Sequence, residues 1–127
     1  MKKKYIITGI VLITLSIMLG AFGAHGLKKV LVSFPEKLTS FETGVKYQMY
    51  MGLSFLWLGT LKVEVGKNLY LIWLVGVIFF SFSIYLLSID PIISFSFSFL
   101  GPVTPLGGLL LIIGWLYLLV NIIKSKI

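Results

Sequence analysis

The sequence predicts an all-α membrane protein: four transmembrane helices in a compact bundle, with an interfacial amphipathic segment between the first and second helices. Composition is the first observation behind this class. Of 127 residues, 58% are hydrophobic and 12% are charged, whereas about a quarter of a soluble domain is charged. A chain of this length forms one domain, residues 1–127, and its core would be too small to bury so many apolar side chains in water. Lipid is therefore the expected solvent.

The second observation is the distribution of charge along the chain. All 11 basic residues are lysines, and they stand at the ends of apolar runs. These runs approach the roughly 20 residues that a helix needs to cross a bilayer. We expect the transmembrane spans at about residues 5–24, 44–61, 69–89 and 105–123.

The first span follows three lysines and is uncharged from Tyr5 to Ala24. A secretory signal peptide is the alternative, because small-residue cleavage sites occur near its end. However, the apolar core of a signal peptide is only about 7–15 residues long. This run is longer and is followed by further apolar runs, so we expect a retained helix.

Residues 25–46 form the one substantial polar stretch. Apolar side chains recur in it at three- and four-residue steps, which predicts one apolar helical face. These residues are Leu27, Leu31, Phe34, Leu38, Phe41 and Val45. Residues 33–36 and 39–42 have the spacing of capping boxes. We expect an amphipathic segment at the interface, leading into a short second span that Lys46 and Lys62 extend by snorkelling.

The third span is expected to end at Asp90 and Pro91. Serine alternates with apolar residues over 93–99, a pattern typical of extended or irregular chain. We expect it at the interface or against protein, because lipid offers its backbone no hydrogen-bond partners. Thr104 is a good N-cap and Pro105 suits the first helical position, so the fourth span begins there.

Four spans put both chain termini on one side of the membrane. That side carries seven lysines, Lys2, Lys3, Lys4, Lys62, Lys67, Lys124 and Lys126. The opposite side carries four, Lys28, Lys29, Lys37 and Lys46. The positive-inside rule then predicts a multi-pass protein of the cell membrane with both termini in the cytoplasm.

Small residues recur seven positions apart in every span, which places each set on one helical face. Such faces let helix backbones approach closely in lipid. The predicted packing residues are Gly9, Ser16, Gly23, Gly52, Gly59, Gly76, Ser83, Gly107 and Gly114.

Polar side chains gather, by this topology, near the non-cytoplasmic interface. Unpaired polar groups near lipid are costly, so we expect a candidate cluster of His25, Glu42, Tyr47, Gln48 and Thr104. Two helix N-termini and nearby lysines also predict an anion or lipid-headgroup contact. Its candidate residues are Lys28, Lys46, Gly107 and Gly108. The alternative interpretations are helix capping, an aromatic belt and ordinary close packing.

Four motifs follow one another along the chain. They are Gly-Ala-Phe-Gly-Ala-His-Gly-Leu-Lys at 20–28, Thr-Gly-Val-Lys-Tyr-Gln-Met-Tyr at 43–50, Phe-Ser-Phe-Ser-Ile-Tyr-Leu-Leu at 80–87 and Gly-Pro-Val-Thr-Pro-Leu-Gly-Gly-Leu at 101–109. Together they resemble the domain of unknown function 423 family, to which transmembrane protein 256 is also similar. The resemblance implies a four-helix membrane protein and no established activity. The family usually has histidine where this chain has Met51.

The residue inventory favours a protein without enzymatic activity. The chain has no cysteine, one histidine and four acidic residues, so we expect no cofactor and no metal site. The leading hypothesis is a bundle that binds membrane lipids or a partner, either another membrane protein or a second copy. We expect no nucleic-acid partner. The alternative is a small-molecule or ion transporter, and a membrane enzyme using His25 with Glu42 or Tyr47 is the third hypothesis.

Overall fold

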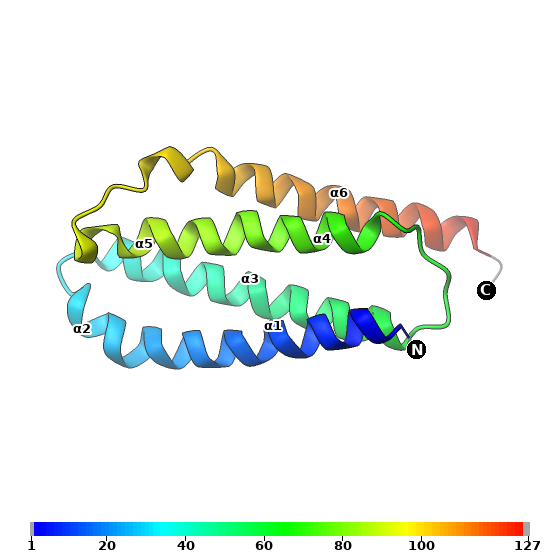
Figure 1. The fold of residues 1–127 in the computed structure, drawn as a ribbon, viewed down its shortest axis with the longest axis horizontal. Helices are drawn as coiled ribbons and strands as arrows, with labels where there is room; N and C mark the ends of the chain where they lie inside the picture. The colour runs from blue at the N-terminus through cyan, green and yellow to red at the C-terminus, as the bar shows by residue number, and fades with distance from the viewer. Residues whose placement is uncertain (1, 126–127) are drawn as a thin grey trace.

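The computed structural model describes residues 2–125, which are almost entirely helical and contain no strand. The helices run side by side along one axis (Figure 1). In chain order the elements are α1 (Lys3–Phe22), the π-helix η1 (Gly23–Leu27), α2 (Lys28–Val30), α3 (Pro35–Thr60), α4 (Leu69–Val77), the π-helix η2 (Ile78–Phe82), α5 (Ser83–Ile93), the 3₁₀-helix η3 (Ser98–Leu100) and α6 (Val103–Lys124). The prediction of an all-helical protein is confirmed.

Three helical stretches in this part of the chain are long and apolar enough to cross a membrane. They are Lys3–Val30, Leu69–Ile93 and Ser98–Lys124. The expected second span is not among them. Its residues belong to α3, whose first twelve residues also carry four charged side chains, Glu36, Lys37, Glu42 and Lys46. Charged side chains lower the hydropathy of the helix, so composition alone does not mark α3 as a span.

The separate amphipathic segment expected before the second span is absent from residues 2–125. The first helix instead continues through η1 and α2 to Val30, and α3 begins at Pro35. The apolar side chains of this segment pack within the protein, except for Phe34, which is exposed. Phe41 is buried together with Leu27 and Leu31 against Tyr85. Other helices therefore cover most of the apolar face, and the membrane interface does not.

Two helix boundaries also differ from the expected ones. Helix α5 continues past Pro91 to Ile93 and ends at Ser94, whose φ of 55° is left-handed. Helix α6 begins at Val103 after an N-cap at Pro102, so Thr104 lies inside the first turn and does not cap it. Between them, residues 95–97 are irregular and residues 98–100 form the short η3.

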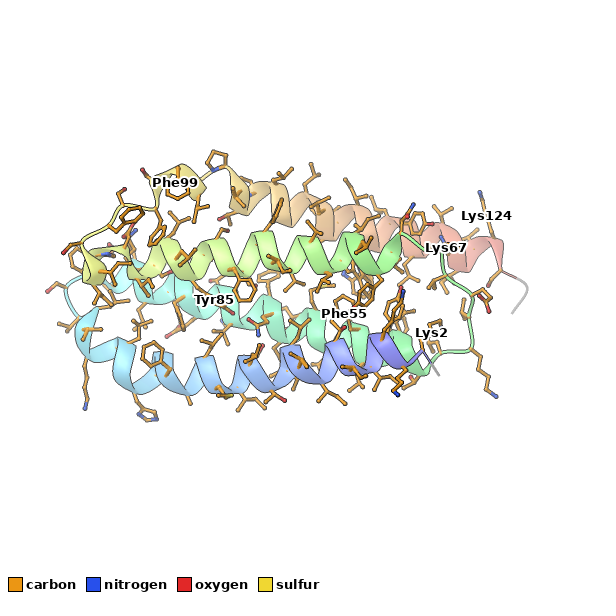
Figure 2. The ribbon with its side chains drawn as sticks, viewed as in Figure 1. Lys2, Phe55, Lys67, Tyr85, Phe99 and Lys124 are labelled. Carbon is orange, nitrogen blue, oxygen red and sulfur yellow. The ribbon has the colours of Figure 1, made fainter. Side chains whose placement is uncertain are left out.

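The start of α1 and the end of α6 lie at the same end of the structure, which we call the terminal end (Figure 1). The α2–α3 and α5–α6 connections lie at the opposite end, which we call the far end. Helix α1 packs along α3, α3 packs against η2 and α5, and α6 packs along α4 and η2. Phe55 and Tyr85 project between the helices, whereas Lys2, Lys67 and Lys124 lie at the terminal end (Figure 2).

All nine predicted packing residues are buried. At Gly9, an added Cβ would lie 2.7 Å from the Gly52 carbonyl oxygen and 2.7 Å from the Leu56 nitrogen of α3. At Gly107, an added Cβ would collide with the Phe80 backbone nitrogen and would lie 2.9 Å from the Gly76 oxygen. At these two contacts helix backbones approach so closely that glycine alone fits.

Candidate functional site

A groove of about 410 Å³ opens at the far end, between α3, α5 and the start of α6. Its lining residues are Lys37, Ser40, Thr43, Ile84, Leu87, Ser88, Gly101, Thr104 and Pro105. Six of these nine belong to three of the four motifs found in the sequence. The groove therefore collects residues that lie far apart in the chain, and it combines polar with apolar walls.

Lys37 is the one charged side chain that lines the groove, and two contacts hold it. Its ammonium group donates a hydrogen bond to the Leu87 carbonyl oxygen at 3.0 Å. It also lies 3.4 Å from an oxygen of Asp90, and both side chains are largely covered. Paired charges of this kind are expensive to place near lipid and often mark functional positions in membrane proteins.

Hydroxyl groups form the rest of the polar lining. Ser88 donates to the Ile84 carbonyl at 2.7 Å, and Thr43 donates to the Thr39 carbonyl at 3.0 Å. The hydroxyls of Thr104 and Ser83 lie 2.5 Å apart and join α6 to α5. A hydroxyl that donates to a carbonyl still has lone pairs that accept hydrogen bonds. The lining can therefore accept hydrogen bonds from a ligand.

Below the groove, buried hydrogen bonds link α1, α3 and α5. Gln48 is 1% exposed; its amide nitrogen donates to the Leu12 carbonyl at 3.0 Å, and its amide oxygen accepts from the Tyr85 hydroxyl at 2.6 Å. Ser81 donates to the Gly44 carbonyl at 2.9 Å. Each bond crosses between helices, so these side chains fix how α3 sits against its neighbours.

The predicted polar cluster does not form as one site. Gln48 is buried in the interhelical network, and Thr104 pairs with Ser83. Tyr47 is 44% exposed, and its ring packs 5.0 Å from the ring of Phe80. His25 and Glu42 are exposed. Glu42 and Gln48 are six residues apart on α3 and face different directions, so Glu42 does not join the buried network of Gln48.

The predicted headgroup contact is also divided. Gly107 is buried against the backbone of Phe79 and Phe80. Both Gly107 and Gly108 lie beyond the first four residues of α6, whose N–H groups are the free ones in a helix. Lys28 and Lys46 are exposed on other helices. The glycines therefore serve packing, because α6 begins earlier than the sequence suggested.

Sequence reasoning named Lys37 only among the lysines near the expected headgroup contact and Ser83 only as a packing residue, and it did not identify Asp90 or Tyr85. The sequence contains one signal that could have identified Lys37, which is Pro91. A proline within a helix leaves the carbonyl four residues earlier without its usual donor, so a side chain can take that place.

Met51, where the family usually has histidine, is 4% exposed in the apolar core. Within residues 2–125, no group of three histidine, cysteine, aspartate or glutamate side chains is placed to hold a metal ion.

Apolar side chains on the outer faces of α1 and α6 remain exposed, among them Ile17, Met18, Ile112 and Leu116. Membrane-length apolar helices, close glycine contacts and uncovered apolar faces together define a helical membrane protein.

Comparison with known proteins agrees with this class. The model of the family "Protein of unknown function (DUF423)" matches residues 19–108, and the chain belongs to this family. UPF0382 membrane protein SH2409 of Staphylococcus haemolyticus is 39% identical over 125 residues, covering 96% of this chain and 97% of the relative. YwdK of Bacillus subtilis, also a UPF0382 membrane protein, is 38% identical over 128 residues, covering 96% and 98%.

A UPF0382 membrane protein of Haemophilus influenzae is 34% identical over 133 residues, covering 99% of this chain and 98% of the relative. No solved structure matches the chain. The resemblance inferred from the four motifs is thereby confirmed.

Proposed function

We propose that this membrane protein has no enzymatic activity and binds a phospholipid in the groove between α3, α5 and α6. The observation that carries the proposal is the ion pair between Lys37, which lines the groove beside accepting hydroxyls and apolar walls, and Asp90, whose carboxylate lies 3.4 Å from the Lys37 ammonium group. A zwitterionic headgroup carries one phosphate and one ammonium, so it complements both members of the pair. Ile84, Leu87 and Pro105 supply apolar surface for the adjoining acyl chain.

The proposal includes α3 as a fourth crossing of the cell membrane. Helix α3 has 26 residues, or roughly 39 Å at helical rise. It lies alongside the apolar helices over the length of the structure (Figure 1). Its charged residues lie among its first twelve residues, within reach of the interface, and residues 47–61 are uncharged. Four crossings put both termini in the cytoplasm and the groove on the opposite side, as the distribution of lysines favours.

The absence of enzymatic activity is supported by the positions of the residues that a reaction would need. His25 is exposed in η1, and no hydrogen bond within residues 2–125 links it to Glu42 or Tyr47. Apart from tyrosine and tryptophan, the buried polar side chains of this part of the chain are serines and one glutamine. A catalytic base needs a partner within hydrogen-bond reach. The arrangement favours binding over catalysis.

The test is lipid binding by the full-length protein in neutral detergent, measured by native mass spectrometry. Phosphatidylethanolamine and phosphatidylglycerol are titrated against the wild type and Asp90→Asn. Because Asp90 pairs with the headgroup ammonium, Asp90→Asn should weaken phosphatidylethanolamine binding about fivefold, the worth of one charge near a membrane surface. Glu36→Gln is the control, since it removes an exposed acid from the same end. An unchanged affinity in Asp90→Asn would refute the proposed headgroup contact.

A transporter is the second candidate, and the polar contacts below the groove favour it. Thr104 pairs with Ser83 between α6 and α5, and Tyr85 pairs with Gln48 between α5 and α3. Such a series of polar groups could guide a small solute between α3 and α5. Proton flux into vesicles, followed with a pH-sensitive dye, should then fall in Gln48→Leu. Equal flux in empty vesicles and in vesicles containing the wild type would exclude proton transport.

A further inference from the structure

We propose that the terminal end carries a second site, which binds the phosphate group of an anionic ligand. The site is a pocket of about 330 Å³ between the start of α1 and the α3–α4 connection. Three lysines line it, Lys2, Lys4 and Lys67, together with Glu64 and Gly66. It lies at the end of the protein opposite to the groove, and it differs from the groove in having an excess of cations.

Lys2 is fixed by the end of α3. Its ammonium group donates to the Leu61 carbonyl at 2.8 Å and to the Leu58 carbonyl at 3.4 Å, and its backbone N–H donates to the Gly59 carbonyl at 2.9 Å. These carbonyls belong to the negative end of the helix dipole and attract a cation. An ammonium group has three N–H donors, so one remains for a ligand.

Lys4 is also held in place. Its ammonium group lies 4.8 Å from the centre of the Tyr70 ring, in a cation–π contact. The Tyr70 hydroxyl lies 2.5 Å from the Thr8 hydroxyl, which fixes the ring against α1. Ordering a lysine side chain on binding costs entropy. Because the protein already orders two of the three lysine side chains, they lose less conformational entropy when the ligand binds.

The third side of the pocket is fixed through Gly66. Its N–H donates to the Asn121 side-chain oxygen at 2.8 Å, and the Asn121 amide nitrogen donates to the Tyr117 carbonyl at 2.8 Å. A side chain at position 66 would collide with the Tyr117 ring. The connection between α3 and α4 is therefore tied to α6, and Lys67 follows directly after the tied residue.

The charges of the pocket select the ligand. Three cations and one carboxylate favour an anion, and lysines bind phosphate as point charges. Lys3, Lys62 and Lys124 belong to the same end and strengthen the positive field. The phosphate can belong to the headgroup of an anionic lipid such as phosphatidylglycerol or to a free phosphate, since both present the same chemistry to the lysines.

The test compares variants of the full-length protein in neutral detergent. Lys4→Gln with Lys67→Gln removes two cations and keeps Lys2, which caps α3. Phosphatidylglycerol should bind this double variant about thirtyfold more weakly than the wild type. Lys28→Gln with Lys29→Gln is the matched control, because it removes the same charge at the far end. Glu64→Gln removes the opposing carboxylate from an exposed position, so it should tighten binding about fivefold.

A parallel titration uses inorganic phosphate and follows the unfolding temperature. Stabilisation by both phosphatidylglycerol and phosphate supports the site with free phosphate as a ligand, and stabilisation by the lipid alone supports it with a lipid headgroup. If the Lys4/Lys67 and Lys28/Lys29 double variants bind phosphatidylglycerol equally, or if Glu64→Gln leaves its affinity unchanged, the site does not exist. Asp90→Asn should leave this affinity unchanged, so failure of the groove proposal is separable from failure here.

Discussion

The ammonium group of Lys37 donates a hydrogen bond to the carbonyl of Leu87, which lies 50 positions later in the chain. In a regular helix that carbonyl would accept a hydrogen bond from the N–H of residue 91, but residue 91 is a proline without an N–H. A side chain from α3 thus replaces the backbone donor that Pro91 removes. The same ammonium group meets Asp90, so one lysine supports both the backbone and the side chain of the last turns of α5.

This relationship predicts that the cost of losing Lys37 depends on Pro91. Lys37→Met leaves the Leu87 carbonyl and Asp90 without their partner, and it should lower the free energy of unfolding by about 1–3 kcal/mol. In a Pro91→Ala background the alanine N–H can pair with Leu87, so Lys37→Met should cost about 1 kcal/mol less. Thermal or denaturant unfolding of the four proteins in detergent measures this coupling.

The control for this cycle is Lys28→Met, which removes an exposed lysine from the same end of the protein. It should change the free energy of unfolding by less than about 0.5 kcal/mol, as exposed substitutions usually do. Equal costs of Lys37→Met with and without Pro91 would show that the Leu87 contact is not what Lys37 contributes.

The pattern of apolar runs was enough to predict the helical class, because lipid solvation depends on local hydropathy. The buried faces of the helices were also predictable in part, since small residues seven positions apart share a face whatever their partner. Gly52 and Gly107 could be named without knowing that they would meet Ile13 and Phe80. The local spacing of small residues therefore predicts which helical faces are buried, but not what they pack against.

The boundaries and the site depend on contacts between distant residues, which no local pattern contains. Helix α5 passes Pro91 because Lys37 supplies a donor from another helix. Thr104 has the sequence context of an N-cap, yet its hydroxyl pairs with Ser83, 21 positions away. The polar stretch expected at the interface instead buries Phe41 against Tyr85. In each case a tertiary contact outweighs a local preference.

The glycine contacts predict a sharp difference between two neighbouring positions in α6. At Gly107 an added Cβ would lie 2.7 Å from the Phe79 carbonyl carbon and closer still to the Phe80 nitrogen, whereas at Gly108 the nearest atom is 3.4 Å away on the Phe80 ring. Backbone atoms cannot move aside as a side chain can. Gly107→Ala should therefore destabilise the protein by about 1–3 kcal/mol, and Gly108→Ala by less than about 0.5 kcal/mol. Unfolding temperatures in detergent that fall equally for both variants would contradict this packing.

The hydrogen bond from Tyr85 to Gln48 predicts a modest loss of stability in Tyr85→Phe. The phenylalanine keeps the ring that packs 5.0 Å from Phe41 but leaves the Gln48 oxygen without its donor. Interhelical hydrogen bonds in membrane proteins contribute about 0.6 kcal/mol on average and about 1.7 kcal/mol at most. The loss of unfolding free energy caused by Tyr85→Phe should lie in this range in the wild type and should be smaller in a Gln48→Leu background. A cost that is the same in both backgrounds would mean that the bond contributes nothing to stability.

Membrane topology gives the last prediction, and it tests the crossing of α3 directly. The chain has no cysteine, so single cysteines can be introduced at Glu64 in the α3–α4 connection and at Ser33 before α3. Both positions are exposed. If α3 crosses the membrane, a membrane-impermeant thiol reagent added to intact cells should label Ser33→Cys, and Glu64→Cys should react only after the cells are opened. Lys124→Cys should behave like Glu64→Cys, because the end of α6 lies at the same end of the structure as the α3–α4 connection (Figure 1). Labelling of Ser33→Cys and Glu64→Cys from the same side would show that α3 remains on one side of the membrane. The three apolar helices would then have to place the start of α1 and the end of α6 on opposite sides of the membrane, whereas both lie at the same end of the structure (Figure 1).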